Sequence, residues 1–174
     1  MPNYNVYMGQ GITIPDLRGN ILATGPGEAE DAVQSCSAVI LVNTANWRAG
    51  LYHFPEGSIN NDEHSRNVLT AMAAAVAPNE AYIGFGVVGL RNTDPQGAAQ
   101  TAQTQNGEQL RSFVLGLLPM GSRLRRLPAA TGTVTVTSNA GRAVIGNQTP
   151  DPLTNLKTAA AGNHGAYTTY GYAM

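Results

Sequence analysis

Charged residues, cysteine and long apolar runs are all scarce in this sequence. Only 12% of the 174 residues are charged, and the formal net charge of -1 excludes the strongly basic surface of a nucleic-acid or anionic-membrane binder. A single cysteine, Cys36, excludes an internal disulfide framework and a cysteine-based zinc site. No apolar run approaches the roughly 18 residues that a membrane-spanning helix needs. We therefore expect a soluble, single-domain protein with no nucleic-acid partner and no membrane span.

Lysine is also scarce. Lys157 is the only lysine of the chain, whereas there are nine arginines. A GC-rich genome would explain this bias, and so would a protein that works inside a foreign cell and avoids modification of its lysines. The opening residues lack a basic region followed by an apolar one, so we expect no ordinary signal peptide. These features favour delivery into a target cell by a specialised secretion system, with the bacterial cytoplasm as the alternative location.

Short apolar stretches broken by glycine and proline run through most of the chain. The 20 glycines and 10 prolines favour short strands and many turns over long helices. Helical spacing of apolar residues predicts one helix that ends before Pro78 and a second over 110–118. Strands are predicted over 4–8, 11–14, 21–23, 38–42, 50–54, 81–88, 123–127, 133–137 and 142–146. This order predicts an α+β fold with central, sandwich-like, mostly antiparallel β-sheets and two main helices packed outside.

Two segments lack this apolar pattern. Residues 91–106 are rich in Gln, Thr, Ala and Asn, which predicts a surface loop or a flap. Residues 147–174 contain prolines, glycines and tyrosines without periodicity. We therefore expect one domain over 1–146, with 147–174 as a C-terminal tail packed on it.

The clearest candidate for chemistry is the pair formed by Cys36 and His53. The apolar runs around these residues predict an antiparallel hairpin that turns within 43–46, a segment of good turn composition. The midpoint of positions 36 and 53 is 44.5, so this register places the two side chains directly opposite, with Cβ atoms roughly 4.5–5.5 Å apart. An imidazole at that distance can take the thiol proton and produce a nucleophilic thiolate. The non-enzymatic alternative is a binding module in which Cys36 is a small buried apolar residue.

Other sequence signals favour ordinary structural roles. The Gly84-to-Gly89 pattern matches a dinucleotide fingerprint, but turn-like residues follow it instead of a helix. Asp62, Glu63 and His64 are adjacent and point in different directions, so they indicate a solvated helix start and no metal site. We expect no cofactor and no bound metal. Arg123 and Arg125 share a face of a predicted strand, which fits either a contact with a target protein or an edge strand protected by charge.

The residues around the pair resemble a known family. Ser35-Cys36-Ser37, followed after a short gap by the segment 49–55 that contains His53, resembles the Cys–His signature of the chemoreceptor glutamine deamidase CheD. The order of elements over roughly 4–146 is similar as well. The same catalytic fold is shared by the cytotoxic necrotizing factor and Burkholderia lethal factor deamidase toxins.

The resemblance implies a protein glutamine deamidase, which hydrolyses a glutamine side chain of a target protein to glutamate. Cys36 would be the nucleophile and His53 the base, and backbone N–H groups at Ser35 and Ser37 would hold the oxyanion. The lysine scarcity favours a bacterial toxin or effector over an enzyme that acts on chemoreceptors.

The sequence does not identify the residue that would orient His53. CheD-type enzymes place a threonine six residues before the cysteine, where this chain has Glu30. The candidates are Thr24, Glu30, Asp31 and a backbone carbonyl. A transglutaminase or another cysteine hydrolase of the same fold is the alternative reading of the chemistry.

Overall fold

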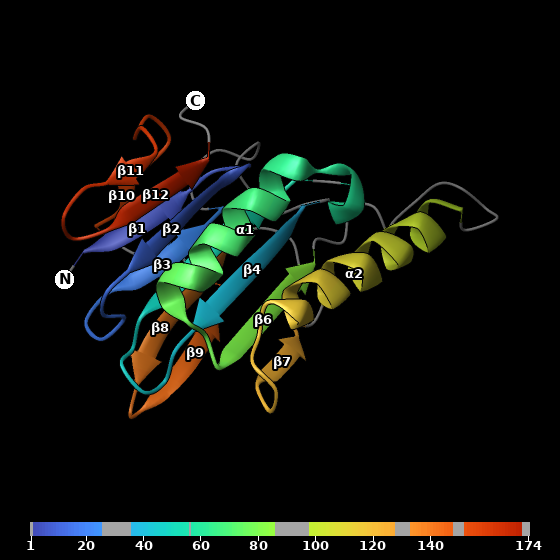
Figure 1. Cartoon of the computed structure of the whole chain (residues 1–174). Helices are drawn as coiled ribbons and strands as arrows, with labels where there is room; N and C mark the ends of the chain where they lie inside the picture. Colours follow the sequence, from blue (N-terminus) through green and yellow to red (C-terminus); the bar gives the residue numbers. More distant parts are fainter. Residues whose placement is uncertain are drawn as a thin grey trace.

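The structure is a computed structural model that describes residues 2–25, 36–55, 57–85, 98–127, 133–147 and 152–171. Its strands form a seven-stranded and a five-stranded sheet, and its main helices are α1 (Glu63–Val76) and α2 (Ala98–Gly116). Figure 1 shows both helices on one side of the seven-stranded sheet. None of the helices in the described residues is long and apolar enough to cross a membrane.

The seven-stranded sheet carries the hairpin with the Cys–His pair at its centre. Its strand order is β11-β12-β2-β5-β4-β6-β7, and its pairs are antiparallel except for β6 and β7. The strands are β2 (Gln10–Ile14), β4 (Ser37–Val42), β5 (Ala49–Phe54), β6 (Glu80–Phe85), β7 (Arg123–Arg126), β11 (Gly162–Asn163) and β12 (Thr168–Gly171).

The five-stranded sheet has the order β10-β1-β3-β8-β9. Strand β1 pairs in parallel with both of its neighbours, and the remaining pairs are antiparallel. The strands are β1 (Asn3–Val6), β3 (Ile21–Thr24), β8 (Val134–Asn139), β9 (Arg142–Gly146) and β10 (Thr154–Asn155).

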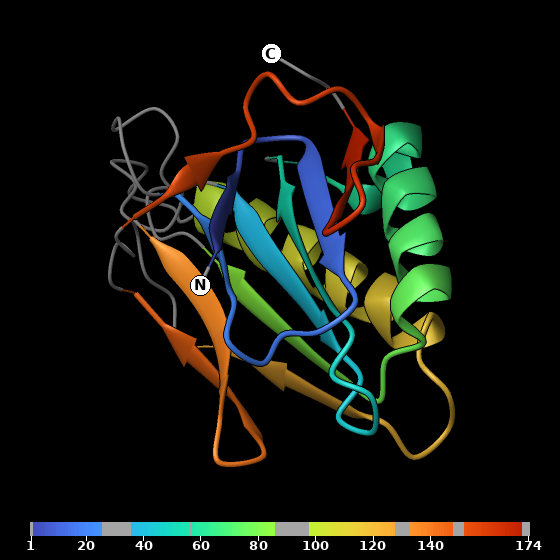
Figure 2. The ribbon, with the colours of Figure 1, turned by 90° about the vertical axis from the view of Figure 1, so that its left-hand side faces the viewer.

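Side-chain alternation along the central strands divides the interior into two cores. Val39 and Leu41 of β4 pack with α1 and α2, whereas Ile40 and Val42 face the five-stranded sheet. Figure 2 shows the resulting layers, with α1 on the opposite side of the molecule from β8 and β9. The predicted α+β class with two helices outside the sheets is therefore confirmed, although the sheets are mixed.

The prediction of a loop over 91–106 is wrong for its second half. Helix α2 begins at Ala98 and continues to Gly116, so the predicted helix over 110–118 is only its C-terminal half. Residues 98–106 contain mainly Ala, Gln and Thr, and both Ala and Gln are good helix formers even without an apolar stripe. Residues 91–97 lie outside the described part of the chain.

The C-terminal segment is built into both sheets. Strand β10 pairs with β1, and β12 pairs with β2. The buried side chain of Gln10 reinforces this contact by donating from Nε2 to the carbonyl of Leu156 at 2.6 Å. Residues 152–171 therefore extend an edge of each sheet.

Candidate active site

His53 and Thr24 join the two sheets in the interior. His53 lies on β5 and faces the five-stranded sheet, as its neighbour Leu51 does, and it is 1% exposed. Thr24 ends β3 of the opposite sheet and is fully buried. The Thr24 Oγ1 atom lies 2.7 Å from His53 Nδ1. Among the candidates for the group that orients His53, the structure thus places Thr24 in hydrogen-bond contact with the imidazole. Glu30 and Asp31 lie outside the described residues.

The hydrogen bonds of Thr24 define the protonation pattern of the His53 ring. The Thr24 hydroxyl donates its single proton to the Val6 carbonyl at 2.8 Å, so it can only accept from His53 Nδ1–H. The neutral ring then carries its lone pair on Nε2. This Nε2 atom is buried and has no hydrogen-bond partner among the described residues.

Burial also keeps the ring neutral. Desolvation lowers the pKa of His53 from 6.5 to about 4, because a buried imidazolium loses its hydration. At neutral pH the imidazole is therefore uncharged, and its Nε2 is a hydrogen-bond acceptor. This is the form that a general base requires.

Cys36 lies in a bend at the start of β4, and the register predicted for it is wrong. His53 pairs with Ala38, and Cys36 directly precedes β4, two residues before Ala38. Two residues are the side-chain period of a strand, so the alternation of β4, extended by one residue to the bend at Cys36, would place Cys36 diagonally from His53, with Cβ atoms roughly 7 Å apart. A slip of one residue would have placed the two positions on opposite faces, whereas a shift of two keeps them on one face of the extended strand.

The loop of the hairpin explains the shift. Asn43 N–H donates to the Arg48 carbonyl, and Trp47 N–H donates back to Asn43. The loop spans 43–48, and Trp47 adopts a left-handed backbone conformation with φ of 62°. The turn is thereby centred one residue later than the composition of 43–46 predicts, which moves every cross-strand partner by two positions.

A turn between β1 and β2 contacts both members of the pair. The Cys36 Sγ atom is 3.8 Å from Met8 Sδ. Gly9, which follows Met8 in the chain, donates its N–H to the His53 carbonyl at 2.9 Å. Cys36 is 8% exposed, whereas Met8 is 47% exposed, so the thiol lies just beneath the surface at this turn. Sequence reasoning missed Met8 and Gly9, because it treated 4–8 as one uninterrupted strand. The left-handed Gly9, with φ of 79°, is the signal that marks the turn.

Of the two serines that flank Cys36, the structure describes only Ser37. Ser35 lies outside the described residues. Ser37 is buried in β4 between Phe54 and Phe85, and alternation directs its side chain toward the helices. The Ser37 hydroxyl is thus not brought to the face that carries His53, and the Ser37 backbone lies within the sheet, paired with both neighbouring strands.

The described residues hold no cluster of three or more potential metal ligands. Comparisons with protein-family models, with curated proteins and with solved structures give no match to this chain. The chemistry of the site is therefore argued from its own residues.

The depressed pKa of His53 predicts a specific dependence of stability on pH. The unfolded chain protonates this residue near pH 6.5, whereas the folded protein does so only near pH 4. The contribution of His53 to the free energy of unfolding is complete above pH 6.5 and is lost as the pH falls to 4, by about 3 kcal/mol in all. Urea unfolding of the wild type and of His53→Gln over this range measures the difference. Equal pH slopes in the two proteins would contradict the assignment.

Proposed function

We propose that this protein is a cysteine-dependent glutamine deamidase acting on a protein substrate. One observation carries the proposal: the Thr24–His53 hydrogen bond leaves Nε2 as a buried acceptor on β5, whose partner strand β4 begins directly after Cys36. A nucleophile, a base and a group that orients the base are the three parts that thiol-based acyl transfer needs. The resemblance of the sequence around Cys36 and His53 to the deamidases supports glutamine as the group attacked.

The reaction proceeds in two balanced steps. His53 Nε2 takes the thiol proton while Cys36 Sγ bonds to the carboxamide carbon, and the same proton is then given to the amide nitrogen as ammonia leaves. The resulting thioester is attacked by water, whose proton passes to His53 and then to the departing sulfur. The products are glutamate and ammonia, and Cys36 returns as a thiol.

The proposal is tested by exposing bacterial and eukaryotic lysates to the wild type and to Cys36→Ser. Peptide mass spectrometry should find one or a few glutamines that gain about one mass unit in the wild-type sample, with ammonia released. The serine variant should convert none of them, because an alcohol paired with the same base is a far weaker nucleophile. Conversion that persists in Cys36→Ser, or no conversion by the wild type in either lysate, would contradict the proposal.

The same experiment separates hydrolysis from transfer to an amine. Adding a primary amine such as methylamine offers the thioester a second acceptor. A deamidase gives mainly glutamate under these conditions, whereas a transglutaminase gives mainly the substituted amide.

A further inference from the structure

A basic pocket lies at the opposite end of the sandwich from Cys36. It has a volume of about 410 Å³ and is lined by Glu80, Tyr82, Arg123, Arg125 and Arg142, among others. Glu80 pairs with Val42, at the far end of β4, which places it about 20 Å along the strand from Cys36. Figures 1 and 2 show β7 and the β8–β9 hairpin together at this end of the molecule. The pocket is therefore separate from the candidate active site.

Strand register brings the charged groups together. Arg123 pairs with Glu80 and Arg125 pairs with Tyr82, so all four side chains share the face that looks toward the five-stranded sheet. Arg142 approaches from the start of β9, next to the tight turn of the β8–β9 hairpin. The neighbouring Arg126 points to the other side, where it forms an ion pair with Glu108 of α2.

The three arginines of the pocket are exposed and without an ion-pair partner in the described part of the chain. Three guanidinium groups less the single carboxylate of Glu80 leave a net charge of about +2 in the lining. Guanidinium groups bind phosphate and carboxylate oxygens through paired N–H donors. The pocket is thus built to receive an anion.

Glu80 gives the pocket one fixed acceptor among these donors. The Tyr82 hydroxyl donates to Glu80 Oε2 at 2.7 Å. Burial, followed by the hydrogen bond to Glu80 and the charge of Glu80, raises the pKa of Tyr82 to about 12, so the phenol remains a donor throughout the neutral range. The carboxylate is held in place, and its second oxygen can accept from a ligand hydroxyl.

We propose that this pocket binds the phosphomonoester of a small hydroxylated molecule, such as a sugar phosphate. The phosphate carries a charge of about -1.5 to -2 at pH 7 and would lie among Arg123, Arg125 and Arg142. A hydroxyl of the same molecule would donate to Glu80. A pocket of this volume falls within the range of small-molecule sites. The inference stands independently of the deamidase proposal.

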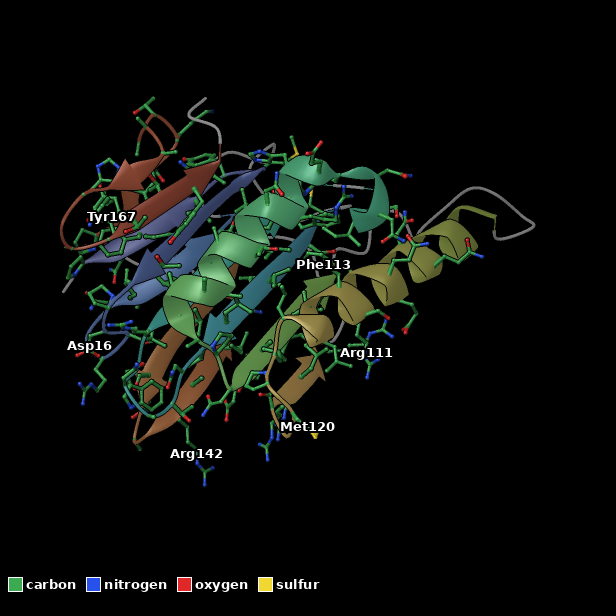
Figure 3. All side chains as sticks on the ribbon, in the orientation of Figure 1. Asp16, Arg111, Phe113, Met120, Arg142 and Tyr167 are labelled. Atoms are coloured by element: carbon green, nitrogen blue, oxygen red, sulfur yellow. The ribbon has the colours of Figure 1, made fainter. Side chains whose placement is uncertain are left out.

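Calorimetric titration of the full chain at low ionic strength tests the proposal with ribose 5-phosphate, inorganic phosphate and ribose as probes. Arg125→Gln should weaken binding of ribose 5-phosphate by roughly tenfold or more, since it removes a charged, forked donor. Arg111→Gln is the matched control, because Arg111 lies on α2, well apart from Arg142 (Figure 3), and is not among the residues that line the pocket. Its substitution changes the net charge equally. This control should change the affinity by less than about twofold.

Glu80→Gln supplies the second arm of the test. It should reduce the preference for ribose 5-phosphate over inorganic phosphate, while inorganic phosphate binds at least as well as before. The proposal is overturned if neither phosphate probe binds the wild type at millimolar concentration, or if ribose binds as well as its phosphate. Equal losses in Arg125→Gln and Arg111→Gln would likewise overturn it, and so would tighter binding of a tetraglutamate peptide.

Discussion

Replacing His53 with glutamine is expected to slow hydrolysis of the target glutamine by about 10² to 10⁴-fold, the range typical of a lost general base. A glutamine side chain can still bond to Thr24, but its amide cannot accept the thiol proton. The loss should appear equally in kcat and in kcat/KM, because the proton transfer takes place only in the transition state. Steady-state kinetics on the substrate found in the lysates measures it.

His164→Gln is the matched control for this variant. His164 is exposed, and its Nε2 lies near Ala160 and Thr169 in the C-terminal segment. Its substitution should leave the rate within about twofold of the wild type. A His53→Gln protein that hydrolyses glutamine at the wild-type rate would remove His53 from the mechanism.

Thr24→Val is expected to lower both stability and rate. Valine has nearly the shape of threonine but leaves the Val6 carbonyl and His53 Nδ1–H without their shared partner in a buried site. Each unsatisfied buried group costs about 1–3 kcal/mol, so the free energy of unfolding should fall by about 3 kcal/mol. Urea unfolding at pH 7.5 measures this change.

The kinetic effect of Thr24→Val separates positioning from a purely structural role. Without the hydroxyl, the ring can turn or place its proton on Nε2, which removes the acceptor that the thiol needs. The rate should fall by roughly tenfold or more. Thr24→Ser retains the hydroxyl and loses one methyl group, at a cost of about 1 kcal/mol in stability, and it should restore the rate. Equal rates in the valine and serine variants would contradict the positioning role.

The two strands of the hairpin could be predicted from the sequence, whereas the register of Cys36 against His53 could not. The apolar runs of β4 and β5 identify the two strands, and alternation determines the face of each side chain. The register depends on the loop over 43–48, where the left-handed Trp47 is set by hydrogen bonds that turn composition does not encode.

The role of Thr24 depends on packing between the sheets. Thr24 and His53 are 29 residues apart and lie on strands of different sheets, so their contact follows from how β3 packs over β5. The sequence could only name Thr24 among several candidates. The two-residue strands β10 and β11 could not be predicted from the sequence either. Their pairing depends on the neighbouring strands β1 and β12 and not on a local residue pattern.

The most direct measurement of the central claim is the rate of Cys36 alkylation by iodoacetamide as a function of pH, in the wild type and in His53→Gln. If His53 accepts the thiol proton, the wild type should react at pH 7 roughly 10 to 100 times faster than the variant. This excess should disappear as the pH falls through the pKa of His53 at about 4. Identical pH profiles for the two proteins would show that Cys36 reacts without help from His53, and the account of this site as a catalytic pair would be wrong.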